Sequence, residues 1–81
     1  MIKESAMIEE GFTYKVLILL SKPGATYVLD LYYKKLPQLK DLEKVANRNK
    51  TKIIGGEIFR LENSDGKQFY KSIKSWGNKV N

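Results

Sequence analysis

The sequence contains no cysteine and no histidine among its 81 residues. Without cysteine, the chain forms no disulfide framework and no zinc site with thiolate ligands. Without histidine, it lacks the usual general base, the Ser-His and Cys-His dyads and the commonest metal ligand. We therefore expect a protein that is not an enzyme and that carries no cofactor and no metal.

Long apolar runs are also missing. The longest, Val16–Leu20, is far shorter than the ~20 residues that a membrane-spanning helix needs. Residues 1–10 include Glu4, Glu9 and Glu10 and have no apolar segment of the kind found in signal peptides. These features predict no membrane insertion and a cytoplasmic location.

The chain has a formal net charge of +6, from 15 Lys and Arg against 9 Asp and Glu. Residues 34–81 hold 12 basic and 5 acidic residues, a net of +7, whereas residues 1–33 hold 3 basic and 4 acidic residues, a net of −1. The positive half favours an acidic partner, which leaves acidic protein, nucleic acid and anionic membrane surface open. Plain solubility is the alternative explanation for such a charge.

The length favours a single domain over residues 1–81. Within it we expect a flexible lead-in over residues 1–11, a folded core over residues 12–73 and a tail over residues 74–81.

Alternating side chains predict two strands near the start of this core, over Phe12–Leu20 and Ala25–Lys35. Ser21–Gly24 lies between them and contains Pro-Gly, which is typical of a tight turn with positive φ at the glycine. The two strands should therefore pair as an antiparallel hairpin. The first strand becomes apolar on both faces toward its end, which predicts a central place in the sheet.

The segment Pro37–Asn49 is predicted to be a helix, because Leu39, Leu42 and Val45 recur at helical spacing. This narrow apolar stripe should pack on one face of the sheet and belong to the core.

Two further stretches alternate after this helix. Glu57–Glu62 predicts a third strand, and the weaker pattern of Lys67–Ile73 leaves a fourth strand open. The predicted fold class is α+β, with a small antiparallel sheet of ββαβ order, with or without the fourth strand, and one helix packed on a face.

A glycine pair, Gly55 and Gly56, stands between the predicted helix and the third strand. Glycine has no side chain to clash, so the backbone can turn sharply or approach another segment closely. We interpret the pair as a structural hinge that sets where the helix lies on the sheet.

Basic and aromatic residues are the candidate partner-binding groups. Lysine and arginine suit contacts with phosphate or carboxylate, and aromatic rings suit stacking on bases. A solvated helix face beside core aromatics would give the same pattern. The candidates are Tyr32, Tyr33, Lys34, Lys35, Lys40, Lys44, Arg48, Lys52, Arg60, Tyr70 and Trp76.

The carboxylates Asp30, Glu57, Glu62 and Asp65 are the only groups that suggest a metal, and no spacing supports that site over ordinary surface charge.

Four blocks of sequence resemble one known family. Phe12 opens the first predicted strand, and Tyr32–Pro37 reads Tyr-Tyr-Lys-Lys-Leu-Pro before the helix. Ile54–Glu62 places the glycine pair at the start of a strand, and Gly66–Gln68 follows as a Gly-Lys turn. Over roughly residues 12–68 this pattern resembles the small linker domain of phycobilisomes, the CpcD-like family. Within it, the small core linkers of allophycocyanin look most similar.

The resemblance implies a noncatalytic linker or capping protein in a light-harvesting antenna, on the stromal or cytoplasmic side of a thylakoid. Its partner would be an acidic phycobiliprotein trimer, since such linkers are basic, carry no bilin and lie in the central hole of phycobiliprotein discs. A chain without cysteine also holds no thioether-bound bilin. Two other classes remain open: a small nucleic-acid-binding or regulatory module, viral proteins included, and a protein inhibitor of a host enzyme.

Overall fold

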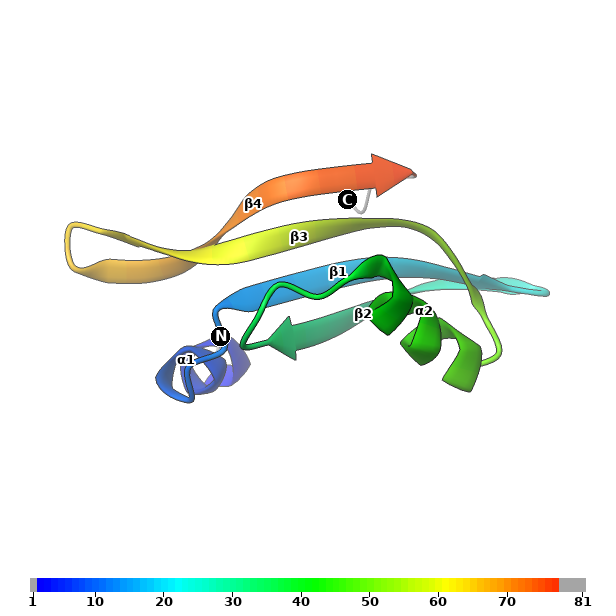
Figure 1. Ribbon diagram of the computed structural model, residues 1–81, viewed down its shortest axis with the longest axis horizontal. Helices are drawn as coiled ribbons and strands as arrows, with labels where there is room; N and C mark the ends of the chain where they lie inside the picture. The colour runs from blue at the N-terminus through cyan, green and yellow to red at the C-terminus, as the bar shows by residue number, and fades with distance from the viewer. Residues whose placement is uncertain (1, 78–81) are drawn as a thin grey trace.

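A four-stranded antiparallel sheet is the largest feature of the computed structural model, which describes residues 2–77 (Figure 1). The elements along the chain are α1 (Ile2–Glu9), β1 (Tyr14–Lys22), β2 (Ala25–Tyr33), α2 (Leu39–Arg48), β3 (Lys52–Ser64) and β4 (Lys67–Gly77). The strands lie in the order β2-β1-β3-β4. This confirms the α+β class and the central place of β1. The fourth strand forms, so the order around α2 is ββαββ instead of ββαβ.

The hairpin of β1 and β2 forms as expected. Its register runs without a break from Tyr14 opposite Tyr33 to Lys22 opposite Ala25. Only Pro23 and Gly24 connect the strands, and Gly24 has a φ of +81°. The Pro-Gly pair therefore closes the turn as predicted, although β1 continues past Leu20 to Lys22.

Two ends of the chain differ from the prediction. Residues 2–9, expected in a flexible lead-in, form α1. The helix ends because Gly11 adopts a φ of +87°, so that its N–H donates to the Ile8 carbonyl and the Phe12 N–H donates to the Met7 carbonyl.

At the other end, residues 74–77 belong to β4 and not to a tail. They pair with β3, with Trp76 opposite Gly56 and Gly77 opposite Gly55. The polar face of this segment hides the strand in the sequence, because β4 is an edge strand with much of its side-chain surface in solvent. Residues 78–81 lie outside the described part of the chain.

The core lies between one face of the sheet and α2. Val16, Ile18 and Leu20 of β1 have no exposed surface, and Leu42 of α2 packs against them at 2 % exposure. The prediction for Leu42 is confirmed, and Val45 packs at the border of this cluster. The prediction for Leu39 is wrong, because its side chain is 58 % exposed.

Both ends of α2 fall inside the predicted range. The helix begins after Gln38, whose backbone N–H donates to the carboxylate Oδ2 of Asp41 at 2.9 Å. It ends where Lys50 takes a φ of +56°, while the Lys50 N–H donates to Asn47 and the Thr51 N–H donates to Ala46. Lys50, a residue without the freedom of glycine, therefore turns the chain from α2 into β3.

The hinge interpretation of Gly55 and Gly56 is wrong, since both lie inside β3 and neither has a positive φ. The other property of glycine, close approach, applies at Gly56. A Cβ atom there would lie 2.7 Å from Cζ2 of Trp76 and 2.9 Å from the carbonyl oxygen of Leu17. Gly56 therefore lets the indole of β4 lie directly on the backbone of β3.

The two faces of the sheet are easily assigned, because directly paired residues of an antiparallel sheet point to the same side. Val16, Leu31 and Ile58 share the face that α2 covers, and Lys15, Tyr32 and Phe59 share the opposite face. The β3–β4 hairpin extends beyond Tyr14, the first residue of β1, and makes the molecule elongated, 44 Å against 23 and 22 Å (Figure 1).

Candidate functional site

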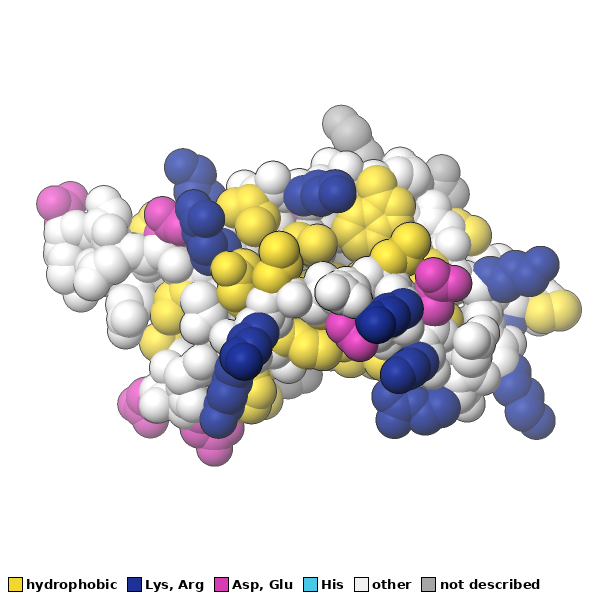
Figure 2. Space-filling model, viewed as in Figure 1, with side chains coloured by type: hydrophobic (Ala, Val, Ile, Leu, Met, Phe, Trp, Pro, Cys, Tyr) yellow, Lys and Arg dark blue, Asp and Glu magenta, His cyan; other side chains and the backbone are white. Residues whose placement is uncertain are grey.

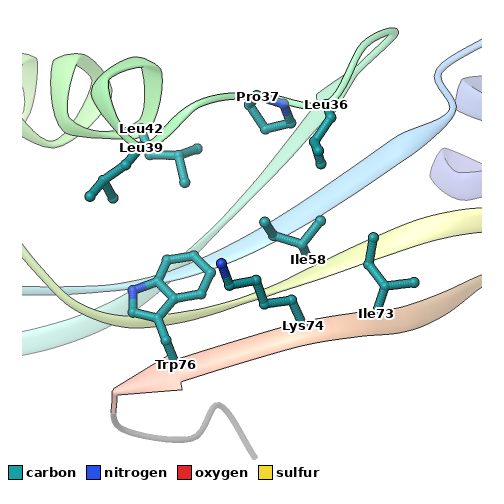
Figure 3. A pocket seen from close by; sticks show the side chains of 8 residues that line it. All are labelled: Leu36, Pro37, Leu39, Leu42, Ile58, Ile73, Lys74 and Trp76. Atoms are coloured by element: carbon teal, nitrogen blue, oxygen red, sulfur yellow. The ribbon is translucent and has the colours of Figure 1, made fainter.

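An apolar groove lies between α2 and the β3–β4 half of the sheet (Figure 3). It has a volume of about 480 Å³. Its walls come from the connection before α2, from α2 itself and from the paired strands β3 and β4. The lining residues, which define the apolar groove here, are Leu36, Pro37, Leu39, Leu42, Ile58, Ile73, Lys74 and Trp76.

The groove exposes large hydrophobic side chains. Leu39 is 58 % exposed, Leu36 is 55 % exposed and Ile73 is 42 % exposed, and all three lie on its walls. Only two other large hydrophobic residues among those described, Val28 and Phe69, are comparably exposed. Water-exposed apolar surface that is gathered in one concave place is typical of a binding site.

Local strand geometry explains why Ile73 reaches the groove. The register between β3 and β4 shifts there, so that Ile58 pairs with Lys74 while Phe59 pairs with Ser72. Ile73 is the extra residue of this β-bulge, and a bulge redirects the side chains around it. Figure 3 shows Ile73, Lys74 and Trp76 of β4 pointing toward Leu36, Pro37 and Leu39 on the opposite wall.

Positive charge borders the groove. Lys74 extends from β4 between Trp76 and Ile58 (Figure 3). Lys35 precedes Leu36 and Lys40 follows Leu39 in the chain, and both are exposed. Figure 2 shows hydrophobic side chains over the middle of this face with Lys and Arg side chains around them. The border is not purely basic, because Glu43 shares a neighbouring hollow with Leu39 and Trp76.

A second surface, the aromatic patch, lies on the face opposite α2. It consists of Tyr32, Phe59 and Tyr70 with Lys15. The rings of Tyr32 and Tyr70 have centroids 5.8 Å apart, and the Lys15 amine lies 5.4 Å from the centre of the Phe59 ring. The Tyr70 hydroxyl donates to the carbonyl of Phe12 at 2.7 Å, which holds its ring over the start of β1. These rings are half-buried, so the patch stabilises the end of the sheet as well as presenting aromatic surface.

The structure divides the predicted partner-binding residues among several places. Trp76 lines the apolar groove, whereas Tyr32 and Tyr70 belong to the aromatic patch on the other face. Arg60 lies on the α2 face but is paired with Glu62 through a 2.8 Å contact from Nε to Oε2. The remaining basic candidates are exposed on the connection, on α2 and at the start of β3: Lys34, Lys35, Lys40, Lys44, Arg48 and Lys52.

Tyr33 differs from the other candidates, because its half-buried ring packs against the core. Burial raises the pKa of Tyr33 above its ordinary value, the carboxylate of Asp41 raises it further, and Arg48 acts in the opposite direction. Its location beside α2 follows from β2, where Tyr33 pairs with Tyr14 on the covered face.

Sequence reasoning misses Leu36, Ile73 and Lys74 as site residues. Exposed leucine or isoleucine has no signature in a sequence, since an apolar residue on a predicted strand or helix is expected in the core. Lys74 falls in the segment predicted to be a tail, so the predicted strands do not place its side chain on the same face as Trp76.

The four carboxylates considered as possible metal ligands do not lie close together. Asp30 and Glu57 lie on either side of Leu17 on the face opposite α2, and Asp65 lies in the β3–β4 turn. Among the side chains that the structure describes, those of residues 5–77, no three His, Cys, Asp or Glu residues gather in a metal-binding arrangement. In the same part of the chain, no helix has the length and apolar character needed to cross a bilayer. Comparisons with protein-family models, curated proteins and solved structures found no significant match for this chain.

Proposed function

We propose that this chain is a noncatalytic docking protein, a linker or cap, that binds an acidic protein partner through the apolar groove. The observation that carries this proposal is the exposure of Leu36, Leu39 and Ile73 around one concave site. Protein interfaces of moderate strength combine a desolvated apolar centre with a charged rim. The groove offers the centre, and Lys74 with the neighbouring lysines offers the rim.

Trp76 is the expected energetic centre of the interface. Tryptophan dominates binding hot spots because it removes a large area from water while its ring stays well packed. Here the indole is held in place by Gly56 beneath it and by the buried cluster beside it. A pre-positioned side chain loses little conformational freedom on binding, so more of the contact energy appears as affinity.

Phycobiliprotein trimers are the first partner to test. Their acidic surface complements a chain of net charge +6. Ile54–Glu62 and Tyr32–Pro37 resemble CpcD-like linkers, whose partners are such trimers. In this proposal the chain sits in the central hole of a disc and carries no pigment. Charge complementarity sets the rate and orientation of docking, and the groove supplies the affinity.

The test compares two double variants with the same change in charge. Leu39→Glu with Ile73→Glu alters the groove, and Val28→Glu with Phe69→Glu alters two exposed hydrophobic residues outside it. We expect the groove variant to weaken binding to purified trimers by about ten-fold or more and the control by less than about three-fold. Binding is measured by calorimetry and by the shift of the trimer absorption band.

Two results would refute parts of the proposal. If trimers do not bind the wild-type chain, the phycobiliprotein partner is wrong. If both double variants weaken binding equally, net charge alone drives the association and the groove is not the docking site.

A second function, binding of single-stranded nucleic acid, is favoured by the aromatic patch. Stacked rings beside lysine on a sheet surface suit bases and phosphates. Because the patch and the groove lie on opposite faces, Tyr32→Ala with Tyr70→Ala tests this function separately. If the patch binds bases, oligonucleotide affinity should fall by ~1–3 kcal/mol per lost stack, and it should depend steeply on salt. We expect oligonucleotides to bind weakly and this variant to change little.

A further inference from the structure

The two edges of the sheet are built differently. The β4 edge carries Lys67, Lys71 and Lys74 and contains the bulge at Ile73. Lysines and bulges are the devices by which proteins prevent edge strands from pairing with other chains. The β2 edge has neither, because Ala25–Tyr33 contains no lysine, arginine or proline and pairs with β1 over all nine residues without a register shift.

The β2 edge is also rich in residues that favour strands. Tyr27, Leu29 and Leu31 point to the core face and are only half-buried, so apolar surface continues up to the open edge. Val28, on the other face, is 45 % exposed. A long, regular and apolar edge of this kind presents unpaired backbone groups together with hydrophobic area that a second strand would cover.

We propose that β2 pairs antiparallel with β2 of a second copy of this chain, which joins two four-stranded sheets into one of eight. A two-fold axis near Leu29 brings identical strands together in antiparallel orientation, so the edge is its own complement. Charge opposes the pairing of two copies less at this edge than elsewhere on the chain. In a chain of net charge +6, Asp30 is the only charged residue of β2, so two copies meet along their least positive strand.

The association is weak and depends on salt. One nine-residue edge covers far less than the 1,200–2,000 Å² of a typical stable interface. We therefore expect a dissociation constant of about 0.01–1 mM. Because each copy carries the positive charge elsewhere on its surface, added salt should strengthen the dimer by screening repulsion.

The experiment uses sedimentation equilibrium of the full chain from about 10 µM to about 1 mM. Thr26→Lys with Val28→Lys places two lysines on the β2 edge at exposed positions. Ser72→Lys with Ser75→Lys places two lysines on the same sheet face of the β4 edge and adds the same charge. The β2 variant should weaken dimerisation by about ten-fold or more, whereas the β4 variant should stay within about three-fold.

Circular dichroism and thermal unfolding verify that both variants are folded. A wild-type chain that remains monomeric at about 1 mM would overturn the proposal, as would equal weakening by both variants. The β2 edge is separate from the apolar groove, so the folded β2 variant should keep the wild-type affinity for a groove partner. Failure of dimerisation and failure of the docking function are therefore distinguishable.

Discussion

Gly56→Ala tests the close approach of the Trp76 indole to the backbone of β3. The added Cβ would lie 2.7 Å from both Cζ2 and Cη2 of Trp76 and 2.9 Å from the carbonyl oxygen of Leu17. All three separations are shorter than a carbon atom tolerates, and the last involves backbone that is fixed by the pairing of β1 with β3. The indole must move away from β3, the strands must separate slightly, or both.

The expected loss follows from two opposing effects. Forcing an extra methyl group into a packed site costs ~1–3 kcal/mol. Gly56 does not have a positive φ, so alanine fits its backbone and gains ~0.4–1 kcal/mol by restricting the unfolded chain. The clash outweighs this gain, and we expect a net destabilisation of about 1–2 kcal/mol, or a fall in Tm of about 5–15 °C.

Urea unfolding followed by circular dichroism measures this loss. Trp76 is the single tryptophan of the chain, so its fluorescence also reports whether the indole has moved. In a Trp76→Leu background the penalty of Gly56→Ala should fall, because the ring that it meets is gone. An alanine variant within about 0.5 kcal/mol of the wild type would refute the close approach. An equal loss in both backgrounds would assign the cost to the Leu17 carbonyl.

Three further predictions concern the helix and its surroundings. Leu42→Ala should lower the unfolding free energy by ~2–5 kcal/mol because Leu42 is buried, whereas Leu39→Ala should change it by less than about 1 kcal/mol because Leu39 is exposed. Equal losses in urea unfolding would contradict the burial of Leu42 and the exposure of Leu39. Lys50→Gly should stabilise the fold by about 1 kcal/mol by relieving the positive φ, and an unchanged or lower Tm would count against that strain. Folding raises the pKa of Tyr33 above 10.0, so the stability contribution of its neutral phenol is complete below that pH and is lost as pH rises through the folded pKa. Tyr33→Phe should therefore flatten the alkaline loss of stability, and a pH profile identical to that of the wild type would exclude Tyr33 as its source.

Patterns that depend on neighbouring residues are predicted well from the sequence. The β1–β2 hairpin is predictable because a Pro-Gly turn and period-two alternation are local properties. The burial of Leu42 follows from helical spacing in the same way. The end of α2 is harder to predict, because Lys50 adopts a conformation that its residue type does not signal.

The candidate site is predictable only in part. The sequence marks Trp76 as a binding candidate, but it does not mark the neighbours of Trp76 in the groove. Leu36 comes from a segment distant from β4 in the chain, and it meets Ile73 and Lys74 only because β4 pairs with β3 beside α2. The aromatic and basic candidates look like one set in the sequence, and the sheet separates Tyr32 and Tyr70 from Trp76 by placing them on opposite faces.

The sequence by itself determined the fold class, the central place of β1, the chemistry of the tight turn and the positive charge of the second half. Each depends on composition or on contacts between residues close in the chain. Only the tertiary structure decided that Gly56 serves a close approach and not a hinge, because that role depends on Trp76, which lies far along the chain and opposite it in the sheet. The tertiary structure likewise decided which hydrophobic residues stay in water, because exposure depends on what α2 leaves uncovered and not on the residue itself.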